Sequence, residues 1–129
     1  MNGKFLLDPN IVIACLSNEP GVVGRIDDAD EFFISSTVLG EILYGAYNST
    51  NVEDNIRRIK SFLSDAGLLT CDGPTSHIYG ETKTELRRKG RPIPDNDIWI
   101  AASAKQHSLT LVTRDIHFDD VDGLPVIRW

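Results

Sequence analysis

The chain has 129 residues, 41% of them hydrophobic and 25% charged, which is typical of a globular domain with a hydrophobic core. Its formal net charge of −6 argues against broad affinity for nucleic acid, because a phosphate backbone attracts Lys and Arg. No apolar run approaches the roughly 18 residues of a membrane span, and the segment before Asp8 is too short for a signal peptide. Cys15 and Cys71 match no metal or redox spacing and are expected to be buried free thiols. We therefore expect one domain over residues 1–129, a cytoplasmic location and no membrane partner.

Short apolar runs alternate with amphipathic segments along the chain. Apolar runs bounded by turn residues predict strands, and apolar residues at helical spacing predict helices. The expected strands cover residues 4–7, 31–35, 68–71, 109–113 and 124–127. The expected helices cover residues 9–16, 20–28, 37–47, 51–66, 74–89 and 97–104. Residues 116–123 are expected to form an irregular polar loop.

Several residues indicate where these helices begin and end. Pro9 suits a first helical position, where its missing N–H is not needed. Serine, aspartate and asparagine commonly cap helix starts, and glycine commonly follows helix ends. The expected caps and ends are Ser35 or Ser36, Asp95 or Asn96, Gly67 and Gly90.

The alternation implies an α/β fold with a mainly parallel sheet of four to five strands, flanked by helices. In such sheets, ligands bind just beyond the carboxyl ends of the strands. Asp8 lies there after the first expected strand, and Asp115 lies two residues beyond the fourth. Glu41, in the second turn of the helix after the second strand, falls on the same rim. Asp97 opens the helix that leads into the fourth strand, so its approach depends on the loop 90–96.

Four carboxylates that meet repel one another unless a cation lies among them. An all-oxygen site suits Mg²⁺ or Mn²⁺, which support phosphate chemistry. Each residue also has an ordinary structural alternative: a helix cap for Asp8, a solvated helix position for Glu41, a favourable helix dipole for Asp97 and a turn for Asp115. The metal site is thus a hypothesis that rests on the joint pattern.

Four segments of the chain resemble, in order, the four motifs of PIN-domain nucleases. These segments are residues 6–10, 36–46, 94–102 and 111–118. The resemblance covers essentially the whole chain, and its last two motifs are quite specific. The spacing and length look like those of the VapC-type toxins of bacterial toxin–antitoxin pairs. The fold implied is a PIN-like (Rossmann-like) three-layer sandwich.

The resemblance implies a Mg²⁺- or Mn²⁺-dependent endoribonuclease that a small antitoxin keeps silent. Asn10 and Thr113 would support the site through hydrogen bonds. Asp95 and Asp119 are spare carboxylates, and Asp119 could hold a second ion. The residues implied to bind metal and to act in catalysis are Asp8, Glu41, Asp97 and Asp115.

Pro9 departs from the family pattern, which usually has a small hydroxyl residue, typically threonine, at this place. Proline removes a hydroxyl and a backbone N–H. If the lost donor normally orients Asp8 or a metal-bound water, activity is reduced. This keeps a second hypothesis open, a catalytically weak PIN module that acts mainly by binding an antitoxin or RNA.

The implied reaction is metal-assisted hydrolysis of an RNA phosphodiester. In-line attack by an activated water would leave a 3′-hydroxyl and a 5′-phosphate. Transfer, ribosomal and messenger RNA are all compatible with the same four carboxylates. No histidine is required, and the three present are interpreted as structural or surface residues without ligand spacing: His77, His107 and His117.

Five of the 13 basic residues lie within nine positions just before the loop that leads to Asp97. They are Lys83, Arg87, Arg88, Lys89 and Arg91. The last four are expected to bind RNA phosphates beside the metal, although cations at a helix end also complement its dipole. Three aromatic residues are candidates for base stacking, for core packing, or for an interface with the antitoxin or within a homodimer: Tyr44, Tyr47 and Trp99.

A phospho-acceptor receiver domain has a similar size, an α/β sheet and an acidic Mg²⁺ pocket. That class usually needs an acidic pair after the first strand and a lysine late in the chain. Here Asp8 is single and no lysine follows Lys105, which disfavours this class.

Overall fold

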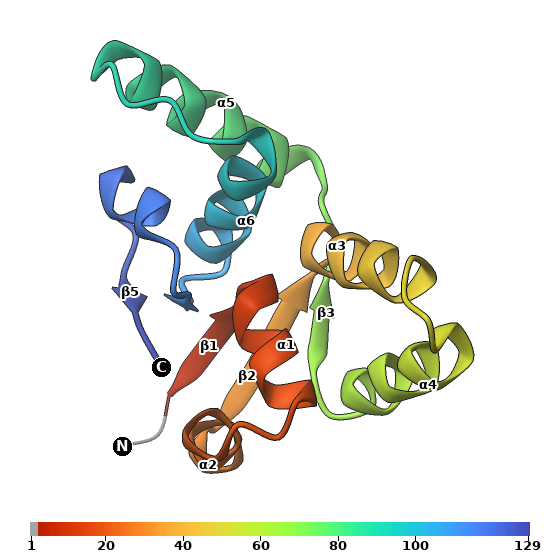
Figure 1. Ribbon diagram of the computed structural model, residues 1–129. Coiled ribbons are helices and arrows are strands. Elements are labelled where there is room, and N and C mark those ends of the chain that lie inside the picture. Colours follow the sequence, from red (N-terminus) through yellow and green to blue (C-terminus); the bar gives the residue numbers. More distant parts are fainter. Residues whose placement is uncertain (1–2) are drawn as a thin grey trace.

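The computed structural model describes residues 3–129 and contains a five-stranded sheet flanked by six α-helices (Figure 1). The strands are β1 (Lys4–Leu7), β2 (Glu31–Ser35), β3 (Gly67–Leu69), β4 (Thr110–Val112) and β5 (Val126–Ile127). The helices are α1 (Pro9–Leu16), α2 (Pro20–Asp28), α3 (Ser36–Tyr47), α4 (Val52–Leu63), α5 (Gly73–Arg88) and α6 (Asp95–Gln106), and a short 3₁₀ helix, η1, spans Ile116–Asp120. The expected α/β alternation is confirmed, and η1 occupies part of the segment that was expected to be irregular.

The sheet has the strand order β3-β2-β1-β4-β5, and all its neighbouring strands are parallel. The chain builds outward from β1 through β2 to β3, then crosses back to place β4 on the other side of β1. The strand order therefore reverses between β1 and β4. Ligands of open α/β sheets bind at such a reversal, beyond the carboxyl ends of the strands. The pairing of Leu7 with Val112 brings the residues that follow these two strands together.

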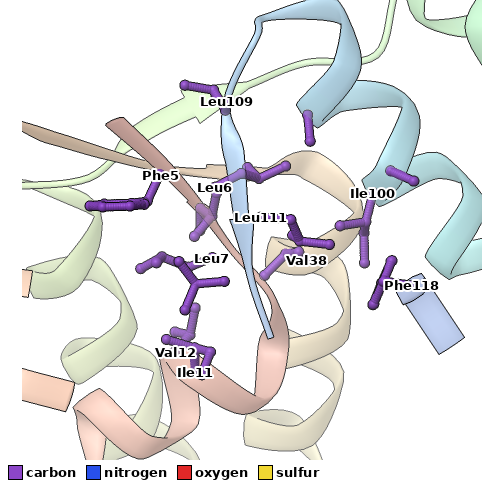
Figure 2. Close-up of a cluster of buried hydrophobic side chains, with 14 of the residues drawn as sticks. Phe5, Leu6, Leu7, Ile11, Val12, Val38, Ile100, Leu109, Leu111 and Phe118 are labelled. Atoms are coloured by element: carbon purple, nitrogen blue, oxygen red, sulfur yellow. The ribbon is translucent and has the colours of Figure 1, made fainter. Parts of the chain in front are cut away.

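The core surrounds β1, whose last three side chains are buried (Figure 2). Leu6 and Leu7 point to opposite faces, and both are fully buried. Burial of each such side chain contributes about 1.5–3 kcal/mol. Ile11 of α1 and Val38 of α3 belong to the same buried cluster, so the core fixes these helices beside the carboxyl end of β1.

Gly67 does not end a helix, which corrects the sequence expectation. Helix α4 stops at Leu63, and the chain turns through Ser64–Ala66 before Gly67 opens β3. Gly67 pairs with Phe33 of β2, and a Cβ atom there would lie 2.4 Å from the Phe33 ring. The glycine therefore serves close packing between two strands.

The start of α6 also differs from the expectation that Asp95 or Asn96 is its cap. Pro94 occupies the cap position, and its carbonyl accepts from the backbone N–H of Asp97 at 3.1 Å. The Asp95 carboxylate instead binds the Lys83 Nζ at 2.9 Å and the Tyr79 hydroxyl at 3.1 Å, both on α5. An ion pair to another helix has replaced the local cap.

Two other expectations for helix ends are confirmed. Ser35 caps α3, since its Oγ accepts from the Val38 N–H at 3.3 Å, and Gly90 follows the end of α5 with a φ of 70°.

The burial expected for the cysteines is wrong for Cys71, which is exposed, whereas Cys15 is half-buried. Within residues 3–129, no helix is both long and apolar enough to cross a membrane.

Candidate active site

Asp8 is a buried carboxylate at the carboxyl end of β1, with only 3% of its surface exposed. It stands at the cap position of α1, but its side chain makes no capping hydrogen bond. Its Oδ2 accepts instead from the Thr113 Oγ at 2.7 Å and the Asn10 Nδ2 at 3.1 Å. Its Oδ1 is buried and has no hydrogen-bond partner among residues 3–129. A capping role therefore does not explain this side chain.

Thr113 and Asn10 link the ends of β1 and β4. The Thr113 Oγ donates to Asp8 and accepts from the Asp115 N–H at 2.9 Å. The Asn10 Oδ1 accepts from the Arg114 N–H at 3.3 Å. Because Thr113 is fully buried, its hydroxyl positions the Asp8 carboxylate and the Asp115 backbone as one unit.

Asp115 ends this β4 segment and begins η1. Its Oδ1 accepts from the backbone N–H of His117 at 2.9 Å, so the turn expected as its ordinary role is present. The Nδ1 of His117 lies 3.2 Å from that same oxygen and 3.2 Å from the Asp97 Oδ2. The first turn of α6 and the segment after β4 therefore meet at the His117 ring. The loop that precedes α6 thus places Asp97 close to Asp115.

Glu41 approaches from the second turn of α3, six residues after the Ser35 cap. Its pKa is raised by burial and by the nearby Asp97 carboxylate, while a hydrogen bond from the Asn96 side chain opposes the shift. The pKa of Asp97 is likewise raised by burial and by Asp115, against the lowering effect of His117. Glu41 and Asp97 are therefore electrostatic neighbours across α3 and α6.

Asp8 carries the largest perturbation of the set. Burial raises its pKa to about 7, the carboxylates of Asp97, Glu41 and Asp115 add to the rise, and the Thr113 hydrogen bond opposes it. The other three carboxylates thus all act on Asp8, and we call this set of four the acidic rim. A divalent cation fits these residues, because it would neutralise their repulsion and give the unpartnered Asp8 Oδ1 a ligand role.

The two spare carboxylates have other partners. Asp95 is paired with Lys83, and both oxygens of Asp119 bind Arg128 at 2.9–3.0 Å. Neither is free to complete the acidic rim without losing its cation.

The basic run lies mainly at the end of α5, which projects from the molecule before residues 89–94 return along that helix to α6 (Figure 1). Arg87, Arg88 and Arg91 are exposed. Lys89 is committed elsewhere: its Nζ donates to the Asp120 carbonyl at 2.7 Å and the Asp122 carboxylate at 2.9 Å. We call residues 87–91 the basic end of α5.

The three aromatic candidates separate into two groups. Tyr44 and Tyr47 on α3 are 72% and 64% exposed, so they do not pack in the core. Trp99 is half-buried and stacks on Tyr79 with ring centroids 4.0 Å apart, which joins α5 to α6. This packing against Tyr79 accounts for Trp99 without a role in stacking on RNA bases.

His117, which the sequence predicts to be a structural or surface residue, lies between two carboxylates of the acidic rim. His77 and His107 are exposed, as expected for surface positions. The available signal for His117 was its place two residues after Asp115, because a turn that follows a strand end keeps such a residue on the same rim.

A family model of the PIN domain matches residues 5–124. The chain belongs to the PIN-domain family. It is of the VapC type: the tRNA(fMet)-specific endonuclease VapC of Shigella flexneri and the ribonuclease VapC2 of Haemophilus influenzae (strain ATCC 51907 / DSM 11121 / KW20 / Rd) are each 35% identical to it over 98% of both chains. Among solved structures, DNA-bound VapBC from Salmonella typhimurium has a TM-score of 0.92 at 32% identity, over 98% of each chain. VapBC2 from Rickettsia felis, bound to a promoter DNA fragment, has a TM-score of 0.90 at 30% identity, over 98% of each chain.

Proposed function

We propose that this PIN-domain protein is a divalent-metal-dependent endoribonuclease, the toxin of a VapBC-type pair, with Asp8, Glu41, Asp97 and Asp115 as its metal-binding and catalytic residues. The observation that carries the proposal is the unpartnered Oδ1 of buried Asp8, whose pKa is raised to about 7 by burial and by the other three carboxylates. A protein gains nothing in stability from such a group, so a ligand-binding role accounts for it best. The ribonuclease names of similar VapC proteins support RNA as the substrate.

The residues of the acidic rim have distinct parts in this proposal. Thr113 and Asn10 hold the Asp8 Oδ2, which leaves Oδ1 as the oxygen available to a cation. Glu41 from α3 and Asp97 from α6 add charge from the helix side, and Asp115 does so from β4. A bound Mg²⁺ or Mn²⁺ would supply Lewis-acid chemistry, which activates water and neutralises charge on the phosphoryl oxygens.

The expected products are a 3′-hydroxyl and a 5′-phosphate, because water rather than the RNA 2′-hydroxyl is the proposed nucleophile. End-labelling distinguishes them: a 5′-phosphate must be removed before a kinase can label the fragment, and a 5′-hydroxyl is labelled directly. Fragments with a 2′,3′-cyclic phosphate would contradict the hydrolytic mechanism.

The activity test compares RNA cleavage by the native protein and Asp97→Asn in Mg²⁺ and in Mn²⁺. Asn keeps the size of the side chain and removes its charge, so cleavage should fall by about 100-fold while the fold persists by circular dichroism. Asp95→Asn is the matched control on the same helix turn, because Asp95 pairs with Lys83. Undiminished cleavage by Asp97→Asn would reject the proposed site.

The second hypothesis, a catalytically weak binding module, depends on Pro9. The structure places Pro9 at the first position of α1, and Asp8 receives its hydrogen bonds from Thr113 and Asn10 instead. These bonds favour an active enzyme without a hydroxyl at position 9. Cleavage that appears only after Pro9→Thr would favour the binding module.

Exposed Arg87, Arg88 and Arg91 are proposed to bind RNA phosphates along the strand. Lys89 is proposed to contribute less, because its amine already binds Asp122 and the Asp120 carbonyl. The basic end of α5 would then guide RNA toward the acidic rim by charge alone.

A small antitoxin is the proposed protein partner, since similar solved structures are of VapBC, which is described as a family of toxin–antitoxin systems. A groove of about 340 Å³ between α1, α3 and α4 has a mainly apolar lining and reaches Glu41, so an occupant would lie beside the acidic rim. Ile13 at this groove is 55% exposed. Ile13→Asp should weaken copurification with the protein encoded by the neighbouring gene, whereas Leu68→Asp on β3 should not.

A homodimer and a cytoplasmic location complete the proposal. Exposed Tyr44 and Tyr47 on α3 offer an aromatic surface for self-association. Analytical ultracentrifugation of the native protein and of Tyr44→Ala/Tyr47→Ala tests it, and a native monomer at micromolar concentration would contradict the dimer.

A further inference from the structure

His117 lies in direct contact with the acidic rim, although a site of four carboxylates does not need a histidine. Its Nδ1 lies 3.2 Å from the Asp97 Oδ2 and 3.2 Å from the Asp115 Oδ1. One possible ligand atom from each of Asp97, Asp115 and His117 lies within 4.8 Å of the other two. Two carboxylates and one imidazole nitrogen thus share a small volume.

The spacing of this group matches that of ligands around one ion. Adjacent ligands of an octahedral ion at 2.0–2.2 Å are separated by roughly 3 Å. The two distances from His117 Nδ1 are close to this value. A hydrogen bond between ring and carboxylate has a similar length, so distance alone leaves both roles open.

The ring is held by the backbone as well as by its own contacts. The His117 N–H donates to the Asp115 Oδ1 at 2.9 Å, and Phe118, the next residue, is fully buried in the core. The side chain is 48% exposed, so solvent can hydrate Nε2 while Nδ1 faces the carboxylates. Nδ1 is therefore placed at the rim by the fold of η1.

A second observation indicates that an ion belongs here. The Oδ1 of Asp8, on the neighbouring strand, is buried and has no partner among the described residues. The carboxylates of Asp97 and Asp115 both act on Asp8 electrostatically. Asp8 is not one of the three residues whose possible ligand atoms lie within 4.8 Å of one another, but a positive ion held by those three would act on its unpartnered carboxylate electrostatically.

We propose that His117 binds the divalent ion directly through Nδ1, so that the site has a mixed oxygen–nitrogen donor set and prefers first-row transition ions such as Mn²⁺ to Mg²⁺. This inference rests on the proposed metal site and adds to it a fifth residue and a metal preference. Mg²⁺ dehydrates reluctantly and binds oxygen, so it keeps water where a transition ion accepts an imidazole.

Pulsed electron paramagnetic resonance of bound Mn²⁺ tests direct ligation without requiring catalysis. A bound imidazole gives modulation from its ¹⁴N nucleus, and this signal should change to that of ¹⁵N when native protein is prepared with ¹⁵N-labelled histidine. Absence of nitrogen modulation in the native Mn²⁺ complex would overturn the proposal, and this measurement needs no variant that might misfold.

Calorimetric titration with Mn²⁺ and with Mg²⁺ separates a ligand from a supporting hydrogen-bond donor. His117→Ala should weaken Mn²⁺ binding about tenfold or more, by analogy with losses of groups that only support metal ligands. It should change Mg²⁺ binding by less than about threefold, since Mg²⁺ retains water there. Equal losses for both ions would indicate a supporting role and overturn the proposal.

His77→Ala is the matched control, because His77 is exposed on α5 and contacts only Glu81 in the described ion pairs. It should leave both affinities and the nitrogen signal unchanged. A nitrogen signal that survives His117→Ala would also overturn the proposal. If the native protein binds neither ion, the metal site itself fails; if it binds Mn²⁺ through nitrogen but cleaves no RNA, only the proposed activity fails.

Discussion

The acidic rim and the basic end of α5 are assembled in opposite ways. The carboxylates of the rim follow β1 and β4 or lie on α3 and α6, and the pairing of β1 with β4 brings Asp8 and Asp115 to the same edge of the sheet. The basic residues are neighbours in sequence, yet they remain exposed on one projecting helix end. Burial raises the pKa of Asp8 at the rim, whereas solvent screens the charges of the basic end.

A high density of charge in the sequence therefore does not indicate which charged groups the fold buries and brings close to one another. Residues that the fold collects and buries interact strongly, because water no longer screens them. Exposed residues in one run interact mainly with whatever approaches from solvent. We therefore expect changes at the rim to affect turnover and changes at the basic end to affect affinity.

The largest expected effect is the loss of turnover in Asp8→Asn. Removal of this charge from the rim should lower kcat about 100- to 1000-fold, the range found when electrostatic stabilisation of a transition state is lost. The measurement is single-turnover RNA cleavage at saturating RNA. Asp119→Asn is the control, because Asp119 pairs with Arg128; a kcat for Asp8→Asn close to the native value would contradict the comparison.

Stability should fall as pH rises in the metal-free protein. The pKa of Asp8 is about 7 in the folded protein and ordinarily 3.8, so the unfolded chain loses this proton first and folding is penalised between about pH 4 and pH 7. The free energy of unfolding should decrease by roughly 2 to 4 kcal/mol more than in Asp8→Asn over that window. Urea denaturation at several pH values checks this, and parallel pH profiles for the two proteins would refute it.

Thr113→Val removes the hydroxyl that links Asp8 to the backbone of Asp115. The part-buried Asp115 N–H loses its partner and the Asp8 Oδ2 keeps only its hydrogen bond from Asn10, which should cost about 1–3 kcal/mol of stability. Cleavage should fall about tenfold or more, as when groups that orient metal ligands are lost. Thr113→Ser keeps the hydroxyl and should retain most of the stability and most of the cleavage activity. Equal losses in Thr113→Val and Thr113→Ser would show that packing of the Thr113 methyl group, and not its hydroxyl, causes the effect.

The smallest effect is expected at the basic end. Arg87→Ala/Arg88→Ala/Arg91→Ala should raise KM several-fold and reduce the salt dependence of RNA binding, with kcat unchanged, because exposed cations contribute mainly by releasing counterions. Arg25→Ala/Arg57→Ala/Lys60→Ala removes the same charge elsewhere and serves as the control. Equal increases in KM for the two triple variants would show that RNA affinity depends on the net charge of the protein and not on the position of the basic residues.

Much of the fold could be predicted from hydrophobic patterns. Leu6 and Leu7 indicated a strand covered on both faces, and the carboxylates after strand ends indicated a rim. Local rules failed where tertiary contacts compete with them. Gly67 suggested a helix end but packs against Phe33, and Asp95 suggested a cap but pairs with Lys83.

The site was predictable in part for the same reason. Strand order brings Asp8 and Asp115 to one rim, and this follows from alternating strands and helices. The position of His117 depends on η1, a short 3₁₀ helix without a hydrophobic period to reveal it. The engagement of Lys89 with Asp122 is a contact between distant segments that no local pattern encodes.

Calorimetric titration of Mn²⁺ into the native protein and four single variants tests the central claim most directly, namely that four separate segments form one metal site. The variants are Asp8→Asn, Glu41→Gln, Asp97→Asn and Asp115→Asn, with Asp95→Asn as the control. The account predicts saturable binding by the native protein, a loss of about tenfold or more in each of the four variants, and native affinity in the control. Native affinity in two or more of the four, or an equal loss in Asp95→Asn, would contradict it.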